Sequence, residues 1–134
     1  MTAVVIDASA GAEIVADSRR GRALARLIPP GSEGWVPEHF YAEVGGTLRR
    51  WVVVQRTLPE AKAQEALSRL GAWMLRRAAV ASLLQAAWPY RHNLTIADAL
   101  YVALAEHLHA DFLTDDHNLV QSPTFPKSVR VLRL

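Results

Sequence analysis

The feature that most constrains the fold is the apolar run at residues 3–6, Ala-Val-Val-Ile, which is followed at once by Asp7. The run is apolar at successive positions and does not alternate with polar residues. A strand with this pattern is buried on both faces, as in a parallel sheet covered by helices. Because parallel strands need long crossover connections, the run predicts an α/β architecture.

The rest of the chain alternates between helical and strand-like segments, as this architecture requires. We expect helices at residues 9–16, 20–28, 38–55, 59–70, 82–92 and 95–109, and a short one ending near residue 121. We expect strands at residues 35–36, within 72–80, at 111–114 and, on the sheet edge, at 129–134. The sequence therefore predicts a three-layer α/β/α domain with a mostly parallel central sheet. At 134 residues, the chain is the size of a single domain, 1–134.

Composition excludes several classes of protein. An apolar content of 51% excludes disorder, and the absence of cysteine excludes both a disulfide framework and a thiolate metal site. No apolar run approaches the roughly 18 residues of a membrane span, and the first residues lack the basic segment of a signal peptide. We therefore expect a cytoplasmic protein without a membrane partner. The net charge of +2 is compatible with nucleic-acid binding but does not demonstrate it.

Four acidic residues occupy positions that suit a functional site. Asp7 and Asp116 each follow a predicted strand, and in parallel sheets ligands bind outside the carboxyl ends of the strands. Asp98 lies in the first turn of the helix at residues 95–109, and Glu43 borders the apolar face of the helix at residues 38–55. These four carboxylates are the candidate catalytic and metal-binding residues.

Each of the four also has an ordinary structural explanation. The two aspartates that follow strands suit helix caps, and Asp98 suits a variant capping box with Thr95. Glu43 suits a salt bridge to Arg49 or Arg50. The sequence alone leaves both explanations open for every residue.

Taken together, the four carboxylates point to a divalent cation. Two unit charges about 4 Å apart repel by roughly 4 kcal/mol at an effective dielectric constant of about 20. If the four side chains converge, either some stay protonated or a cation neutralises them. Hard oxygen ligands favour Mg²⁺ or Mn²⁺.

Four segments resemble a known family. The segment LTIADALYVALAE at residues 94–106, followed by ADFLTDD at 110–116, resembles the DAxxxALA helix and the T-x-D strand end of VapC-type PIN domains. VVIDAS at residues 4–9 is similar to their opening hhhDxS element, in which h is hydrophobic. PEHFYAEV at residues 37–44 resembles their second acidic motif. The match runs in order from Val4 to about Leu119, and its most specific part is the helix at residues 94–106 with the T-x-D strand end that follows.

The resemblance implies a PIN fold with one acidic cluster that holds Mg²⁺ or Mn²⁺. The residues at the matching positions are Asp7, Glu43, Asp98 and Asp116, with Ser9 and Thr114 as hydrogen-bonding supports. The T-x-D frame selects Asp116, while its neighbour Asp115 competes or assists.

The implied function is a Mg²⁺- or Mn²⁺-dependent endoribonuclease that cleaves RNA, with tRNA or rRNA as the expected targets, by means of a metal-activated water. Such proteins are the toxins of type II toxin–antitoxin pairs, are neutralised by a VapB-like antitoxin and commonly form homodimers. Two alternatives stay open: a non-catalytic PIN-like binding module, and a phospho-acceptor receiver domain. Candidate RNA-contacting cations are Arg19, Arg20, Arg22, Arg26, Arg49 and Arg50, although solvated helix faces explain most of them more simply.

Overall fold

The computed structural model describes residues 2–134. Five strands form one sheet in the order β3-β2-β1-β4-β5. The strands are β1 (Ala3–Ile6), β2 (Glu33–Pro37), β3 (Arg76–Ala78), β4 (Asp111–Leu113) and β5 (Val131–Leu132). Every neighbouring pair is parallel, which confirms the prediction from the apolar run. A receiver domain has the order 2-1-3-4-5, so that alternative is wrong.

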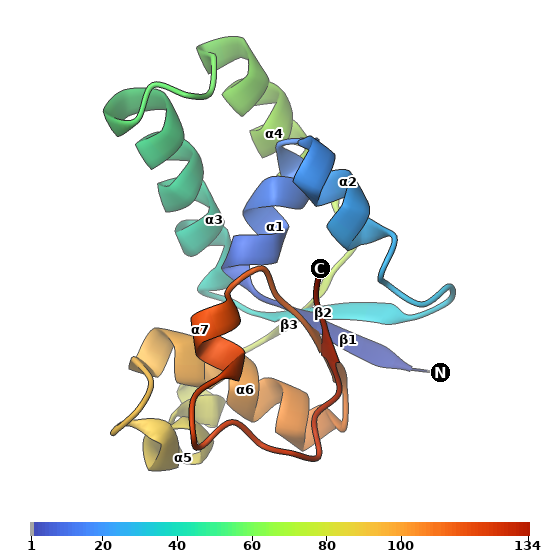
Figure 1. Cartoon of the computed structure of the whole chain (residues 1–134), viewed down its shortest axis with the longest axis vertical. Coiled ribbons are helices and arrows are strands. Elements are labelled where there is room, and N and C mark those ends of the chain that lie inside the picture. The colour runs from blue at the N-terminus through green and yellow to red at the C-terminus, as the bar shows by residue number, and fades with distance from the viewer. Residues whose placement is uncertain (1) are drawn as a thin grey trace.

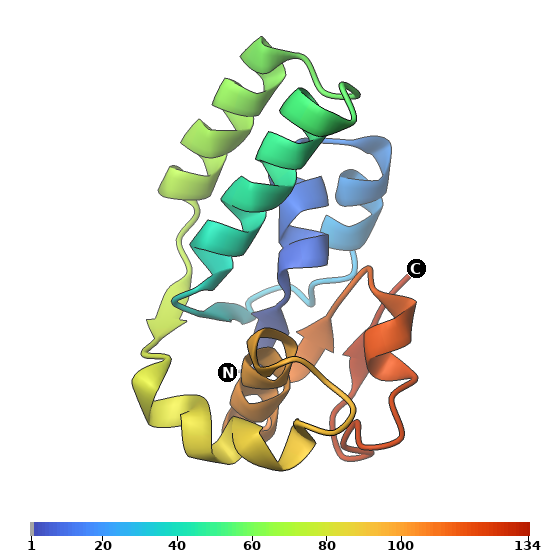
Figure 2. The ribbon, with the colours of Figure 1, turned by 90° about the vertical axis from the view of Figure 1, so that its left-hand side faces the viewer.

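Helices cover both faces of the sheet (Figure 1). One face carries α1 (Ala8–Val15), α2 (Arg19–Ala25), α3 (Phe40–Arg49) and α4 (Glu60–Ala72). The other carries α5 (Leu84–Ala87) and α6 (Ile96–Leu108), with α7 (His117–Val120) near the C-terminal strands. Figure 2 shows α3 and α4 as an antiparallel pair extending beyond the sheet. The predicted three-layer arrangement is thus confirmed. No helix within residues 2–134 has the length and apolarity that a bilayer crossing needs.

Two predicted helices are broken in the structure. The helix expected at residues 38–55 ends as α3, and a π-helical turn follows at Arg50–Val54, with the N–H of Gln55 donating to the carbonyl of Arg50 at 2.9 Å. The helix expected at 82–92 divides into a 3₁₀ turn (Ala81–Leu83), α5 and a second 3₁₀ turn (Trp88–Tyr90). Pro89 lies in the second turn, where its missing N–H rules out a regular α-helical hydrogen bond.

Strand β1 lies at the centre of the sheet and leads directly into Asp7. Val4, Val5 and Ile6 of β1 are at most 1% exposed, as the unbroken apolar run requires. Ile6 pairs with Leu113 of β4, and the N–H of Asp7 donates to the carbonyl of Leu113 at 3.1 Å. After β1 the chain continues to β2 on one side of β1, and later in the sequence it returns to β4 on the other side of β1. This is the topological switch point at which α/β sheets bind ligands.

Two glycines set how closely the helices on the first face approach one another. A methyl group on Gly21 of α2 would lie 1.9 Å from the carbonyl oxygen of Glu13 in α1. A methyl group on Gly11 of α1 would lie 2.5 Å from the ring of Phe40, the first residue of α3. The packing of α1 against α2 and α3 therefore depends on the missing side chains.

We expect Gly21→Ala to lower the free energy of unfolding by about 1–3 kcal/mol, because overpacking here pushes against backbone. The matched control is Gly45→Ala in α3, where a methyl group meets nothing within 4 Å. That control should stabilise the protein by about 0.5–1 kcal/mol, because alanine favours the helix. Urea denaturation measures both. Equal stabilities for the two variants would contradict the close α1–α2 approach.

Candidate active site

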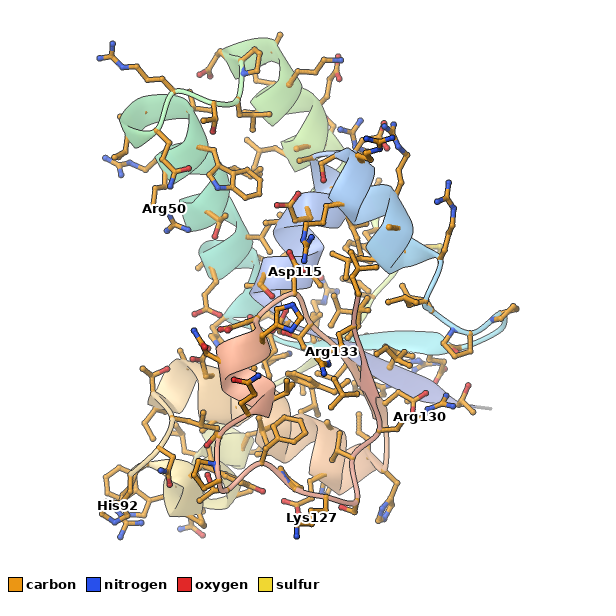
Figure 3. The ribbon with its side chains drawn as sticks, viewed as in Figure 1. Arg50, His92, Asp115, Lys127, Arg130 and Arg133 are labelled. Carbon is orange, nitrogen blue, oxygen red and sulfur yellow. The ribbon has the colours of Figure 1, made fainter. Side chains whose placement is uncertain are left out.

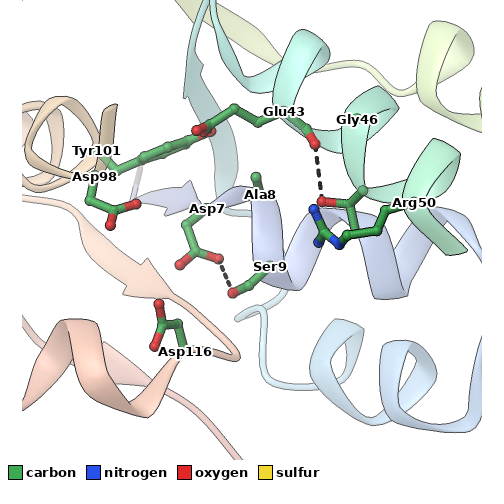
Figure 4. Close-up of a pocket in the computed structure, with 10 residues that line it drawn as sticks. Asp7, Ala8, Ser9, Glu43, Gly46, Arg50, Asp98, Tyr101 and Asp116 are labelled. Carbon is green, nitrogen blue, oxygen red and sulfur yellow. Dashed lines mark hydrogen bonds between the residues drawn. The ribbon is translucent and has the colours of Figure 1, made fainter. Parts of the chain in front are cut away.

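A cavity of about 350 Å³ opens at the carboxyl edge of β1 and β4 (Figure 4). Its lining includes all four candidate carboxylates, which come from separate parts of the chain: Asp7, Glu43, Asp98 and Asp116. Asp7 follows β1, Glu43 lies in α3, Asp98 lies in the first turn of α6 and Asp116 precedes α7. The structure therefore brings together the residues that the sequence singled out.

Asp7 is the most buried of the four, with 5% of its surface exposed. One carboxylate oxygen accepts hydrogen bonds from the Ser9 hydroxyl at 2.6 Å and from the N–H of Ala10 at 3.0 Å. The other accepts from the hydroxyl of Thr114. Burial raises the pKa of Asp7 from 3.8 to about 6, although these hydrogen bonds act to lower it. Ser9 and Thr114 thus contact Asp7 directly, and the bond from Ala10 also makes Asp7 the N-cap of α1.

Asp98 combines a structural and an electrostatic role. Its N–H donates to the hydroxyl oxygen of Thr95 at 3.2 Å, so the expected cap of α6 is present. Burial raises the pKa of its carboxyl group, and the negative charges of Glu43 and Asp116 raise it further. The neighbouring charges therefore disfavour the ionisation of Asp98, as crowding predicts.

Glu43 is held by two residues that sequence analysis did not identify. The hydroxyl of Tyr101 donates to its carboxylate at 2.7 Å, and Nε2 of His39 lies 3.4 Å from the same oxygen. Burial raises the pKa of Tyr101 and the bond to Glu43 raises it further, so the phenol stays protonated and donates. Tyr101 lies three residues after Asp98 on α6, a spacing that places both on one helix face and that points to the pair.

The alternative explanation of Glu43, a salt bridge to Arg49 or Arg50, is not found among residues 2–134. His39 instead connects α3 to α6, because its Nε2 also lies 2.9 Å from the carbonyl oxygen of Ala97 and donates to it. Its buried Nδ1 has no hydrogen-bond partner among residues 2–134.

Asp115 and Asp116 have different surroundings. Asp116 lines the cavity and caps α7, accepting from the N–H groups of Asn118 at 3.0 Å and Leu119 at 3.3 Å. Asp115 forms an ion pair with Nε of Arg20, 2.7 Å from one of its oxygens and 2.8 Å from the other. Its side chain lies near α2 (Figure 3). The geometry therefore favours Asp116 over Asp115 as the fourth carboxylate of the cavity.

The cavity suits a hard divalent cation by its chemistry. Carboxylate and hydroxyl oxygens dominate its polar lining, and oxygen is the ligand that Mg²⁺ and Mn²⁺ prefer. In residues 2–134, however, no three Asp, Glu or His side chains stand close enough together to share one ion. The donor set therefore fits a cation by its chemistry, while the four carboxylates line the cavity without forming a group of three ligands around one point.

Comparison with known proteins identifies the family. The PIN domain model matches residues 4–122. Ribonuclease VapC1 of Mycobacterium tuberculosis is 34% identical over 134 residues, covering 99% of this chain and 100% of that protein. The crystal structure of M. tuberculosis VapC20, a sarcin–ricin loop cleaving toxin, superimposes with a TM-score of 0.64 at 22% identity, covering 95% of this chain and 98% of that one.

A second solved structure, Rickettsia felis VapBC2 bound to a DNA fragment from their promoter, contains a chain that superimposes with a TM-score of 0.66 at 10% identity. The superposition covers 98% of each chain. At these low identities the two solved structures show a common fold, whereas the match to VapC1 over the full chain shows common descent. The chain belongs to the PIN domain family, in its VapC branch.

Proposed function

We propose that this protein is an endoribonuclease that uses Mg²⁺ or Mn²⁺ and acts as the toxin of a toxin–antitoxin pair. One observation carries the proposal: Asp7, Glu43, Asp98 and Asp116, distant in sequence, line one cavity at the switch point of the sheet. A pocket built only for structural reasons has no need to gather four carboxylates, because the neighbouring charges raise the cost of ionising Asp7 and Asp98.

Asp7, Asp98 and Asp116 would hold the cation, with Glu43 as a further ligand or as the residue that orients water. A bound cation would lower the pKa of a water and would stabilise negative charge on the scissile phosphate. Water would form the new bond to phosphorus as the bond from phosphorus to the 3′ oxygen breaks, which would leave a 5′-phosphate and a 3′-hydroxyl.

The protein's own contribution is to fix these carboxylates in place. Ser9 and Thr114 donate to Asp7, so its oxygens keep one orientation while it is charged. The hydroxyl of Tyr101 in α6 donates to Glu43 in α3, and His39 lies beside the same carboxylate oxygen. Such outer partners are commonly worth about 10–100-fold in metal affinity or activity.

RNA is the proposed substrate because the full-length relative VapC1 is named a ribonuclease. We propose tRNA or rRNA as the target class, from the family resemblance and in keeping with the name of VapC20. The proposed partner is a VapB-like antitoxin, as in the VapBC2 complex, and the proposed assembly is a homodimer. We also propose that the protein acts in the cytoplasm.

A second candidate is a PIN-like binding module whose carboxylates only cap helices. One observation favours it: Asp7 caps α1 and Asp116 caps α7, while no three ligand side chains of the described chain are grouped for one ion. The two candidates differ in whether a divalent cation binds and whether RNA is cut.

Asp98→Asn should lower the rate of RNA cleavage by roughly 100-fold or more, because the change keeps the shape of a metal ligand but removes its charge. The rate is measured in Mg²⁺ with end-labelled tRNA and rRNA. The control is Asp17→Asn on the surface, where the φ angle of 55° suits asparagine and activity should not change. If Asp98→Asn cleaves at the wild-type rate, the metal-site assignment is wrong.

Mn²⁺ should stabilise the wild-type protein by about 2.7 kcal/mol at about 100 times its Kd, and should stabilise Asp7→Asn much less. Differential scanning fluorimetry with and without EDTA measures this effect. Absence of any Mn²⁺ effect on the wild type would favour the capping module.

In EDTA, the stability advantage of Asp7→Asn over wild type should grow as pH rises from about 4 to 6 and then level off. The folded pKa of Asp7, about 6, lies above its ordinary value of 3.8, so the folded state binds more protons in this range. Stability from this group is therefore present below the ordinary pKa and is lost as pH rises through the folded pKa, by roughly 3 kcal/mol at most. Urea denaturation at several pH values tests the trend, and a constant difference would contradict it.

Expression of the wild type should arrest bacterial growth, and expression of Asp98→Asn should not. Co-expression of the cognate VapB-like antitoxin should restore growth. This outcome tests the toxin role separately from cleavage in solution. Continued growth with a protein that cleaves RNA in solution would argue against a toxin.

A further inference from the structure

One face of α3 forms a wall of the carboxylate cavity. Glu43, Gly46, Thr47 and Arg50 all line the cavity, and their spacing of three, four and seven residues places them on the same helical face. Figure 4 shows the guanidinium group of Arg50 beside this face, at the end of the wall. Arg50 is the one basic residue in the cavity lining, among four carboxylates.

Arg50 differs from several other arginines in having no carboxylate partner within residues 2–134. Arg20 pairs with Asp115, Arg76 with Glu33 and Arg130 with Asp111. Figure 3 shows Lys127, Arg130 and Arg133 over the C-terminal segment, away from Arg50. The donors of Arg50 are therefore available at the cavity, and its side chain is exposed.

No side chain projects from α3 at Gly46, which lies between Glu43 and Arg50 in the cavity lining. A methyl group there would meet nothing within 4 Å, so packing within the chain does not require the glycine. A glycine inside a helix costs about 0.5–1 kcal/mol relative to alanine. The missing side chain leaves room along α3, beside the path from the carboxylates to Arg50.

We infer that Arg50 is a substrate-binding residue that holds a phosphate of the RNA next to the scissile one. This inference rests on the proposed function. The four carboxylates repel an RNA backbone, and a guanidinium group at the cavity wall offsets that repulsion while presenting two parallel N–H donors to one phosphate. Arg50 thereby positions the strand across the cavity.

The simpler explanation is that Arg50 only balances the charge of the carboxylates. The two roles predict different results. A counter-charge competes with the divalent cation, so its removal would tighten Mn²⁺ binding and leave RNA affinity unchanged. A phosphate contact leaves Mn²⁺ binding nearly unchanged and weakens RNA binding in a salt-dependent way.

The adjacent residue Arg49 provides a matched control. It lines a different groove, together with Val52 and Val53 of the π-helical turn and Leu67 of α4. Arg49→Gln and Arg50→Gln make the same change in charge and size at neighbouring positions. Any difference between them therefore reflects location, since the overall charge effect is equal.

The experiment measures binding of a fluorescein-labelled single-stranded RNA of mixed sequence by anisotropy, at several salt concentrations. Both changes are made in the Asp98→Asn background, so that the probe is not cut. We expect Arg50→Gln to weaken binding about tenfold or more and Arg49→Gln to change it little. The slope of log affinity against log salt should fall in magnitude by about 0.7 for Arg50→Gln.

Three results would overturn the inference: equal RNA affinities for the two variants, an unchanged salt slope for Arg50→Gln, or tighter Mn²⁺ binding without loss of RNA affinity. Mn²⁺ stabilisation of each single variant, measured with Asp98 intact, also shows that the fold and the cation site persist. Because binding is measured without cleavage, the inference can fail while the nuclease assignment holds. Wild-type cleavage by Asp98→Asn would instead defeat the proposed function.

Discussion

The parallel pairing of β1 with β4 is the constraint on which the site depends. It ends two central strands at one edge and places Asp7 beside Thr114, where burial disfavours the charge of the carboxylate. Three hydrogen-bond donors surround Asp7, yet its pKa stays raised to about 6. The other carboxylates arrive from α3, α6 and α7, which pack around this same edge. The sheet thus fixes the position of the cavity and also buries Asp7 there, which disfavours its charged form.

Features that depend on residues close together in the sequence are predictable from it. The unbroken apolar run gave a strand buried on both faces, and Thr95 with Asp98 marked the start of α6. The three-layer architecture followed from the alternation of such elements. The four carboxylates were identified because strand ends and first helical turns are positions that local patterns reveal. Their convergence in one cavity agrees with this reasoning, and their chemical roles stay predictions.

Features that depend on contacts between distant elements were not predictable. The sequence offers a salt bridge to Arg49 or Arg50 as one explanation of Glu43, whereas in the structure the hydroxyl of Tyr101 donates to it and His39 lies beside it, because α6 packs near the start of α3. The π-helical turn at Arg50–Val54 has no clear sequence signal, so the helix at residues 38–55 was expected to be regular. Which of two adjacent arginines faces the cavity depends on how α3 is rotated about its axis. A residue count along the helix supplies that rotation only after one contact is known.

The contact between Gly11 and Phe40 has a consequence for variation in this family. Because no side chain separates them, α1 and α3 lie close, and Ser9 near the start of α1 and Glu43 of α3 line the same cavity. The distance between the two helices is therefore set at a buried contact that lies outside the cavity lining. A larger side chain in place of Gly11 would push α1 and α3 apart and widen the cavity, while every residue that lines it is retained.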